Sequence, residues 1–242
     1  PESIKKGFEL LEAEEGCWAE YALPYEEYLV EAARDKMKRQ KGWMTRTHLT
    51  VLPGGRILLP LYSDGYNLSI IGISDDMGET WNASAPIVGY GPTQPSLVQR
   101  SDGTLMAYLR DEGNAPQRVQ FASSKDNGET WTPSMDMDIP NPSSSLEVIA
   151  LKDGRWLMLC NDSEEHRHRL VIMTSEDEGA TWSKKQQVEP WNDDGFSFEY
   201  PSIIQAKDGL IHMSYTRKSA AGKTIAHCTL NTEWLAEREE VQ

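Results

Sequence analysis

Long hydrophobic runs are missing from this 242-residue sequence. No uninterrupted apolar stretch approaches the roughly 18 residues that suggest a membrane-spanning helix, so the sequence predicts no membrane span. The composition, 38% hydrophobic and 26% charged, is that of a globular protein. A chain of this length can form one large domain or two small ones, and we expect one repetitive domain.

Basic residues are also scarce: 24 Lys and Arg stand against 38 Asp and Glu, which gives a net charge of −14. Affinity for a phosphate backbone comes largely from clustered Lys and Arg, so we expect no nucleic-acid partner. The acidity does not exclude an anionic sugar, because a local arginine cluster can dominate the field inside a pocket.

Cysteines are few, and none has the spacing of metal ligands; they are Cys17, Cys160 and Cys228. One thiol stays unpaired even if a disulfide forms. His166 and His168 alternate with two arginines in a polar stretch, which is more typical of a solvated surface than of a metal site. We therefore predict no metal and no cofactor.

What the sequence does have is a repeated octapeptide, S-x-D-x-G-x-T-W, hereafter the box. Its three copies start 50 and 51 residues apart, at Ser74–Trp81, Ser124–Trp131 and Ser175–Trp182. Each copy follows a β-rich run and carries Gly where a tight turn needs positive φ. The Ser and Asp can bond turn amides, the Thr can close the turn, and the Trp can be buried between sheets. The box therefore predicts a structural strand-turn-strand.

A second repeat, a hairpin signal, appears four times. The hairpins span Leu49–Tyr62, Pro95–Tyr108, Leu146–Leu159 and Pro201–Tyr215, and their turn glycines are Gly55, Gly103, Gly154 and Gly209. Each repeat of about fifty residues thus holds four antiparallel strands, as a propeller blade does. Two form the hairpin, the third precedes the box, and the fourth begins at the Trp of the box. We count four blade-like units in an all-β fold. The last lacks a box, has its third strand at Lys223–Leu230, and ends in a predicted helix at Thr232–Glu240.

The first forty residues do not fit the repeat. Pro24–Gln40 has apolar residues at helical spacing, and we predict a helix there, outside the blades. The predicted organisation is thus a helical insertion or remnant of an earlier blade at residues 1–42, then propeller blades with a short C-terminal helix at residues 43–242.

The boxes resemble those of Asp-box (BNR) proteins, and the blade rhythm over Trp43–Leu235 resembles the sialidase (neuraminidase) superfamily of six-bladed β-propellers. The resemblance implies a tyrosine nucleophile activated by a glutamate, three arginines that clamp the substrate carboxylate, and an aspartate acid/base. Sialidases are an exception to the two-carboxylate rule of glycosidases. On this reading two earlier blades would come from an N-terminal segment outside this chain, and we expect a secreted or periplasmic protein.

The stretch around Tyr200 resembles the family's final-blade motif, which assigns Tyr200 the nucleophile position. Residues 94–110 resemble the stretch from the activating glutamate to a clamp arginine, which assigns Arg110 as that arginine. Gln94 stands in place of the glutamate, and it cannot take a proton at neutral pH. The alternatives are a Tyr200 ring packed on a neighbouring blade and an Arg110 paired with Asp111.

Other candidates are less specific. Arg167 or Arg169 lies where a further clamp arginine is expected, and the sequence does not choose between them. Glu147 is the best alternative carboxylate for proton transfer, although it could equally be an exposed strand residue. Arg46 either lines the channel or caps its strand. Further carboxylates at predicted strand ends are Asp162 and Glu199.

The resemblance implies a sialidase-like glycoside hydrolase that acts on a terminal, acidic sugar of a glycan. Tyr200 and Glu147 would be catalytic, and the substrate-binding residues would be Arg46, Gln94, Arg110, Arg167 and Arg169. The alternatives are a non-catalytic glycan-binding propeller and a propeller scaffold for protein contacts.

Overall fold

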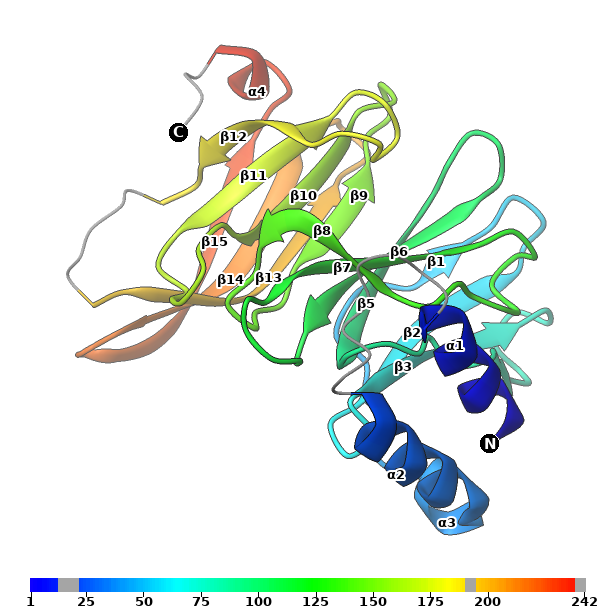
Figure 1. The fold of residues 1–242 in the computed structure, drawn as a ribbon. Coiled ribbons are helices and arrows are strands. Elements are labelled where there is room, and N and C mark those ends of the chain that lie inside the picture. The colour runs from blue at the N-terminus through cyan, green and yellow to red at the C-terminus, as the bar shows by residue number, and fades with distance from the viewer. Residues whose placement is uncertain (13–21, 190–194, 238–242) are drawn as a thin grey trace.

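The computed structural model describes residues 1–12, 22–189 and 195–237 (Figure 1). Three helices come first: α1 (Glu2–Glu12), α2 (Ala22–Arg34) and α3 (Lys36–Arg39). A fourth, α4 (Trp234–Glu237), follows the last strand. None of the helices in these ranges is long and apolar enough to cross a membrane.

The strands between the helices form four antiparallel sheets, which we number as blades in chain order. Blade 1 holds β1 (Thr50–Val51), β2 (Ile57–Ser63), β3 (Leu68–Ser74) and β4 (Asn82–Ala83). Blade 2 holds β5 (Pro92–Gln99), β6 (Leu105–Asp111), β7 (Arg118–Ser124) and β8 (Met135–Pro140). Blade 3 holds β9 (Glu147–Ala150), β10 (Trp156–Asn161), β11 (Leu170–Ser175) and β12 (Ser183–Gln187). Blade 4 holds β13 (Ser197–Gln205), β14 (Ile211–Ser219) and β15 (Gly222–Leu230).

Each sheet runs in sequence order from its first strand outwards, which is the arrangement of a propeller blade. The four sheets are set side by side in an arc, from blade 1 in blue and cyan to blade 4 in orange (Figure 1). The four hairpin glycines all have φ between 87° and 93°, a range open to glycine, and these turns set the register of each first pair of strands. The predicted all-β, four-blade propeller arrangement is confirmed.

The blades share their hydrophobic cores rather than each having its own. One cluster joins blades 1 and 2, around Leu58 and Leu105, and a second joins blades 2 and 3, around Tyr108 and Trp156. A third joins blades 3 and 4 and includes Ile203. Because a sheet must bury at least one apolar face, packing each blade on its neighbour supplies the core that a single four-stranded sheet lacks.

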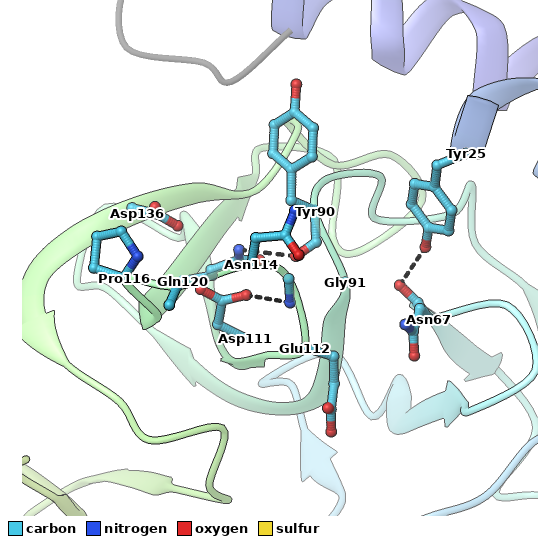
Figure 2. Close-up of a pocket in the computed structure, with 12 residues that line it drawn as sticks. Tyr25, Asn67, Tyr90, Gly91, Asp111, Glu112, Asn114, Pro116, Gln120 and Asp136 are labelled. Carbon is cyan, nitrogen blue, oxygen red and sulfur yellow. Dashed lines mark hydrogen bonds between the residues drawn. The ribbon is translucent and has the colours of Figure 1, made fainter. Parts of the chain in front are cut away.

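The N-terminal helices cover blade 1. Phe8 of α1 and Leu29 of α2 are buried in a cluster with Leu68 of β3. Tyr25 of α2 donates its hydroxyl to the backbone oxygens of Tyr66 and Asn67, each at 2.6 Å, in the turn between β2 and β3. Figure 2 shows the bond to Asn67. These helices are therefore fixed to the propeller by both apolar and polar contacts.

The helices differ in detail from the sequence prediction. The single helix expected over Pro24–Gln40 is two helices, because the carboxylate of Asp35 accepts from the amides of Met37 and Lys38 and so caps a new start. Helix α1 was not predicted. At the other end, helix α4 occupies Trp234–Glu237 of the expected Thr232–Glu240, and residues 238–240 lie outside the described residues.

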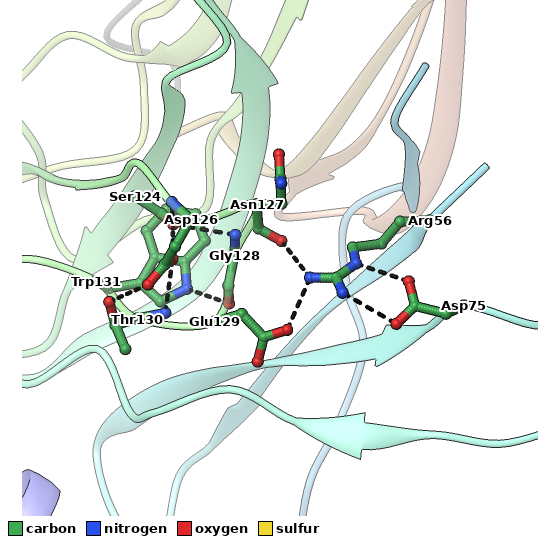
Figure 3. Close-up of polar contacts among 9 residues, drawn as sticks. All are labelled: Arg56, Asp75, Ser124, Asp126, Asn127, Gly128, Glu129, Thr130 and Trp131. Carbon is green, nitrogen blue, oxygen red and sulfur yellow. Dashed lines mark hydrogen bonds and ion pairs between the residues drawn. The ribbon is translucent and has the colours of Figure 1, made fainter. Parts of the chain in front are cut away.

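The boxes make the predicted turns. In the second box, Ser124 donates to Asp126 at 2.8 Å and accepts from the Gly128 amide at 3.0 Å, while Thr130 donates its hydroxyl to the Asp126 carboxylate (Figure 3). The first and third boxes repeat these bonds. The hydrogen bonds lower the pKa of the carboxyl groups of Asp76 and Asp177 to about 2.

Two of the box tryptophans pack on the hydrophobic clusters between neighbouring blades. Trp131 packs on the cluster between blades 1 and 2, and Trp182 packs on the cluster between blades 2 and 3. Trp81 of the first box is 44% exposed, so the prediction of a buried indole is wrong there. The reason is that no sheet precedes blade 1 among the described residues, whereas the other two indoles cover the core shared with the preceding blade.

An ion cluster ties the first two boxes together at the edge of the propeller. Arg56, which follows the first hairpin glycine, pairs with Asp75 through Nε at 2.7 Å and with Glu129 through Nη1 at 2.8 Å (Figure 3). Its Nη1 also donates to the backbone oxygen of Asn127 at 3.2 Å. The arginine thus connects blade 1 with the box turn of blade 2.

We expect Arg56→Met to lower the free energy of unfolding by about 1 kcal/mol, because a network contributes more than a single exposed pair. The loss should shrink in about 1 M NaCl, where surface charges are screened. The matched control is Arg155→Met: Arg155 follows the third hairpin glycine but pairs with Asp153 in its own turn. Urea unfolding of both variants at two salt concentrations measures the difference, and equal losses would contradict the inter-blade role.

Candidate active site in the propeller mouth

Three of the candidates, Arg46, Gln94 and Tyr200, hold equivalent positions in their blades, and Ser145 holds that position in blade 3. Counting back nine residues from each hairpin glycine gives Arg46, Gln94, Ser145 and Tyr200 in blades 1 to 4. In blades 2 and 4 this position lies at a bulge of the first strand, between Thr93 and Ser96 and between Glu199 and Ser202. Gln94 has φ 54° and Tyr200 has φ 53°. A left-handed backbone is uncommon for such residues, and strain of this kind clusters at functional sites.

The segment before β9, residues 143–146, accepts hydrogen bonds from arginines of blades 1, 2 and 3; we call it the Ser143 segment. Arg110, at the end of β6, donates to the hydroxyl of Ser143 from Nη2 at 3.0 Å. Arg167, from the loop between β10 and β11, donates to the backbone oxygen of the same residue. Two arginines from two blades therefore meet at Ser143.

Arg46 comes to this segment from blade 1. Its Nη2 donates to the backbone oxygen of Leu146, and its Nη1 donates to that of Pro201 in β13 at 2.7 Å. Its Nε is buried and has no hydrogen-bond partner among the described residues. Of the two sequence alternatives, a channel-lining arginine and a strand cap, these contacts favour the channel.

Several charged or ionisable groups near Arg46 affect the pKa of its guanidinium. Burial lowers the pKa of the Arg46 guanidinium, and the Arg110 cation acts in the same direction. The Glu147 carboxylate and the phenol of Tyr200 act in the opposite direction. Arg110, Glu147 and Tyr200 thus each lie within electrostatic range of Arg46.

Arg110 does not pair with Asp111, which was the alternative reading of the sequence. Its ion-pair partner is Glu112, whose other carboxylate oxygen accepts from Ser143 at 2.9 Å. Asp111 accepts instead from the amides of Gly113 at 2.6 Å and Arg118 at 3.0 Å. The Arg110 side chain is only 12% exposed, so it is not a surface arginine.

Glu147 is fully buried, so the alternative of an exposed strand residue is wrong. One carboxylate oxygen accepts from the amide and ring Nδ1 of His48, at 3.2 and 2.8 Å, and the other from the amide of Ile203 at 2.7 Å. Burial alone would raise its pKa, but the His48 hydrogen bonds and the Arg46 charge outweigh it and lower the pKa. A carboxylate held in this way joins blades 1, 3 and 4; its role in proton transfer stays a prediction.

Gln94 and Tyr200 differ in exposure. Gln94 is buried, and its side-chain oxygen accepts from the hydroxyl of Ser145, the equivalent residue of blade 3. Tyr200 is 48% exposed, so its phenol can meet a ligand. The buried Gln94 is therefore suited to holding neighbouring side chains in place, and the exposed Tyr200 is suited to contact with a ligand.

The remaining candidates have other partners. Arg169 lies directly before β11, where its backbone oxygen accepts from the Asp162 amide at 3.0 Å. The Asp162 carboxylate pairs with Lys185 at 3.0 Å, and Glu199 pairs with Lys223 at 3.1 Å. Of the two arginines that the sequence left open, Arg167 is the one that shares Ser143 with Arg110.

His166 and His168 lie beside each other, with ring centroids 5.8 Å apart, and line a pocket with Arg167 and Phe196. Within the described ranges, no group of three or more His, Cys, Asp or Glu side chains could hold a metal ion.

Sequence reasoning missed three residues of the site: Ser143, Glu112 and His48. Ser143 and Glu112 come from irregular loops, where no periodicity marks them. His48 could have been found by counting seven residues back from Gly55, the position that Glu147 holds before Gly154.

Two curated proteins are similar to this chain. A sialidase from Paraclostridium sordellii is 31% identical in an alignment 128 residues long, and the match covers 45% of this chain and 30% of that protein. An anhydrosialidase from Macrobdella decora is 25% identical in an alignment 191 residues long, and the match covers 72% of this chain and 24% of that protein. The chain thus spans less than a third of the length of these relatives.

Solved structures show the same fold. The NanB sialidase from Streptococcus pneumoniae gives a TM-score of 0.65 at 18% identity and covers 76% of this chain, which covers 30% of it. A Penicillium chrysogenum α-L-arabinanase in complex with arabinobiose gives a TM-score of 0.59 at 17% identity, with 78% and 63% covered. Both are propellers of glycan-directed enzymes, so the chain has a glycoside hydrolase-like fold.

The comparison with family models agrees with the repeats and the blades. The model described as a BNR repeat-like domain matches residues 40–213, which include all three boxes and the inner strands of all four blades. The chain therefore belongs to the BNR repeat-like domain family, in the sialidase superfamily.

Proposed function

We propose that this protein is a sialidase-like glycoside hydrolase that acts on a terminal, acidic sugar. One observation carries the proposal: Arg46, Arg110 and Arg167, from three different blades, all donate to residues 143–146. In a chain with a net charge of −14, these three guanidinium groups outnumber the carboxylates of Glu112 and Glu147 beside them and leave a local positive charge. Such a cluster suits a carboxylate, which a guanidinium can bind through two parallel hydrogen bonds.

Arg110 has donors to spare for a substrate. The contacts of Arg110 engage Nε and Nη2, and its Nη1 carries two more N–H groups. The unpaired Nε of Arg46 is buried, so of these two arginines Arg110 is the one with N–H groups to offer a substrate. The backbone and serine oxygens hold the guanidinium groups in position before a substrate arrives, which lowers the entropic cost of binding.

Tyr200 is the proposed nucleophile. Its phenol oxygen would bond to the anomeric carbon as the bond to the leaving oxygen breaks; the phenol proton passes to a base, and the leaving oxygen receives a proton. Water then cleaves the tyrosyl-sugar bond and restores the phenol. A neutral phenol avoids the repulsion that a carboxylate nucleophile would meet from the sugar's own carboxylate, and the nearby Arg46 cation stabilises negative charge on the attacking oxygen.

The test is hydrolysis of an aryl sialoside by the full-length protein and by Arg110→Met. We expect the variant to raise KM at least about tenfold, because one charge-assisted contact to the carboxylate contributes about 1.5–3 kcal/mol. The matched control is Arg118→Met, which removes an arginine of blade 2 that pairs with Glu164. Equal KM values for Arg110→Met and wild type would refute the clamp, and faster turnover of an uncharged aryl galactoside would refute the acidic substrate.

A second function, glycan binding without catalysis, is favoured by one specific observation. Gln94 occupies the position where the family resemblance implies a glutamate, and its oxygen is engaged by Ser145. An amide cannot accept the tyrosine proton at neutral pH. Binding of a sialoside without release of the aryl group would support this candidate.

A further inference from the structure

Two histidines lie against each other on the exposed surface of blade 4. The rings of His212 in β14 and His227 in β15 have centroids 5.4 Å apart and are nearly parallel, at 18°. Nδ1 of His212 is 3.2 Å from Nε2 of His227. His212 pairs with Ile204, four residues along β13 from Tyr200, so the histidine pair lies away from the candidate active site.

Strand pairing brings these two side chains together. His227 lies opposite Ser214, two residues from His212, so the histidines are diagonal neighbours on one face of the sheet. Ile211 and Met213, which flank His212, belong to the core shared with blade 3, and alternation along β14 turns the histidines to the opposite face. The histidines are 15 residues apart in sequence, so no ligand spacing marks them there.

The separation of the two ring nitrogens matches the span of two ligands on one metal ion. Zinc–imidazole bonds are about 2.0–2.1 Å long, and two such bonds at the tetrahedral angle hold their nitrogens about 3.3–3.4 Å apart. The 3.2 Å between Nδ1 of His212 and Nε2 of His227 is close to this span. The pair is exposed, so either ring can turn slightly to direct its lone pair at an ion between them.

The surrounding chemistry indicates which ions fit. Neutral imidazole is a good ligand for Zn²⁺, Cu²⁺ and Ni²⁺, whereas Mg²⁺ and Ca²⁺ prefer oxygen ligands. In the part of the chain that the structure describes, no third His, Cys, Asp or Glu completes a metal-binding group, so water would fill the other positions. The hydroxyl oxygen of Thr229, 3.3 Å from Nδ1 of His212, can accept a hydrogen bond from such a water. A net charge of −14 favours the approach of cations.

We propose that His212 and His227 form a surface site for a divalent transition-metal ion such as Zn²⁺. The ion would bind Nδ1 of the first and Nε2 of the second, in place of the hydrogen bond between the rings. It would thereby link β14 to β15, which is paired on one side only among the described strands. Because the two nitrogens meet only when the strands are paired, the ion stabilises the folded blade. This site is independent of the proposed hydrolase function.

The experiment is a calorimetric titration of the full-length protein with ZnCl₂ at neutral pH, after removal of metal with a chelator. We expect one site with a Kd of about 1–100 μM, because two ligands give about half the binding free energy of a four-ligand structural zinc site. His212→Gln and His227→Gln should each weaken binding at least about tenfold.

The matched control is a double variant of the other histidine pair, His166→Gln with His168→Gln. Those rings are 5.8 Å apart and tilted by 53°, and this variant should bind Zn²⁺ within about twofold of wild type. NMR of the histidine ring nitrogens identifies the ligand atoms, and Zn²⁺ should shift Nδ1 of His212 and Nε2 of His227. Hydrogen exchange of the β15 amides should slow when the ion is bound.

Three results would overturn the site. The first is the absence of saturable Zn²⁺ binding, and the second is equal weakening by the control and by the variants of blade 4. The third is binding that leaves the ring nitrogens of His212 and His227 unshifted. None of these results bears on aryl sialoside hydrolysis, which tests the mouth alone.

Discussion

Tyr200→Phe is expected to reduce kcat for an aryl sialoside by at least about a thousandfold, which corresponds to about 4 kcal/mol of lost transition-state stabilisation. The substitution removes one oxygen, the atom proposed to bond to the anomeric carbon. Because the side chain is 48% exposed, its hydroxyl is not needed to satisfy a buried group. The fold and the affinity for the sialoside should therefore be retained.

The control is Tyr62→Phe, since Tyr62 is another phenol within electrostatic range of Arg46. It should change kcat less than about threefold. Steady-state and single-turnover kinetics of both variants measure the effect, with sialoside binding followed separately. If Tyr200→Phe turns over as fast as Tyr62→Phe, the nucleophile is another group.

Glu147→Ala is expected to lower the free energy of unfolding by about 3–5 kcal/mol, the usual loss when one partner of a buried ion pair is removed. The buried amide of Ile203 would lose its acceptor, and Arg46 would lose the carboxylate that stabilises its charge. The effect should reach three blades at once, because the carboxylate binds groups from blades 1 and 4 and belongs to blade 3. Urea unfolding followed by tryptophan fluorescence measures it.

Glu199→Ala is the matched control, because Glu199 has the same side chain and pairs with the largely exposed Lys223. An exposed partner keeps its hydration when the pair is lost, so we expect a loss below about 1 kcal/mol. If Glu147→Ala and Glu199→Ala lowered the free energy of unfolding equally, the buried contacts of Glu147 would contribute no more to stability than an exposed ion pair.

The repeats made the fold predictable. A box with fixed Ser, Asp, Gly and Thr residues specifies its own turn, and a hairpin glycine with positive φ specifies the register of two strands. Both signals are local, and both recur about every fifty residues. The helices were harder, because the cap at Asp35 that divides α2 from α3 is one residue within a continuous helical pattern.

The site was only partly predictable, because it depends on contacts between distant residues. Tyr200 and Arg110 were selected from motifs and Arg46 from its place near the start of the first hairpin, and in the structure Arg110 and Tyr200 both lie within electrostatic range of Arg46. Ser143 belongs to the site because Arg110 and Arg167, from different blades, both donate to it. No sequence pattern indicates that these three residues come into contact. Burial of Glu147 likewise depends on the packing of three blades.

Main-chain carbonyl groups hold much of the proposed clamp: those of Ser143, Leu146 and Pro201 receive the guanidinium hydrogen bonds of Arg167 and Arg46. Every residue type carries a carbonyl, so exchanging a side chain such as that of Leu146 removes none of these acceptors. Substitutions can therefore change the side chains around the arginines while the guanidinium groups keep their supporting hydrogen bonds. If the arginines bind an anion as proposed, a scaffold of this kind can change its preference among charged ligands without losing the groups that hold the charge.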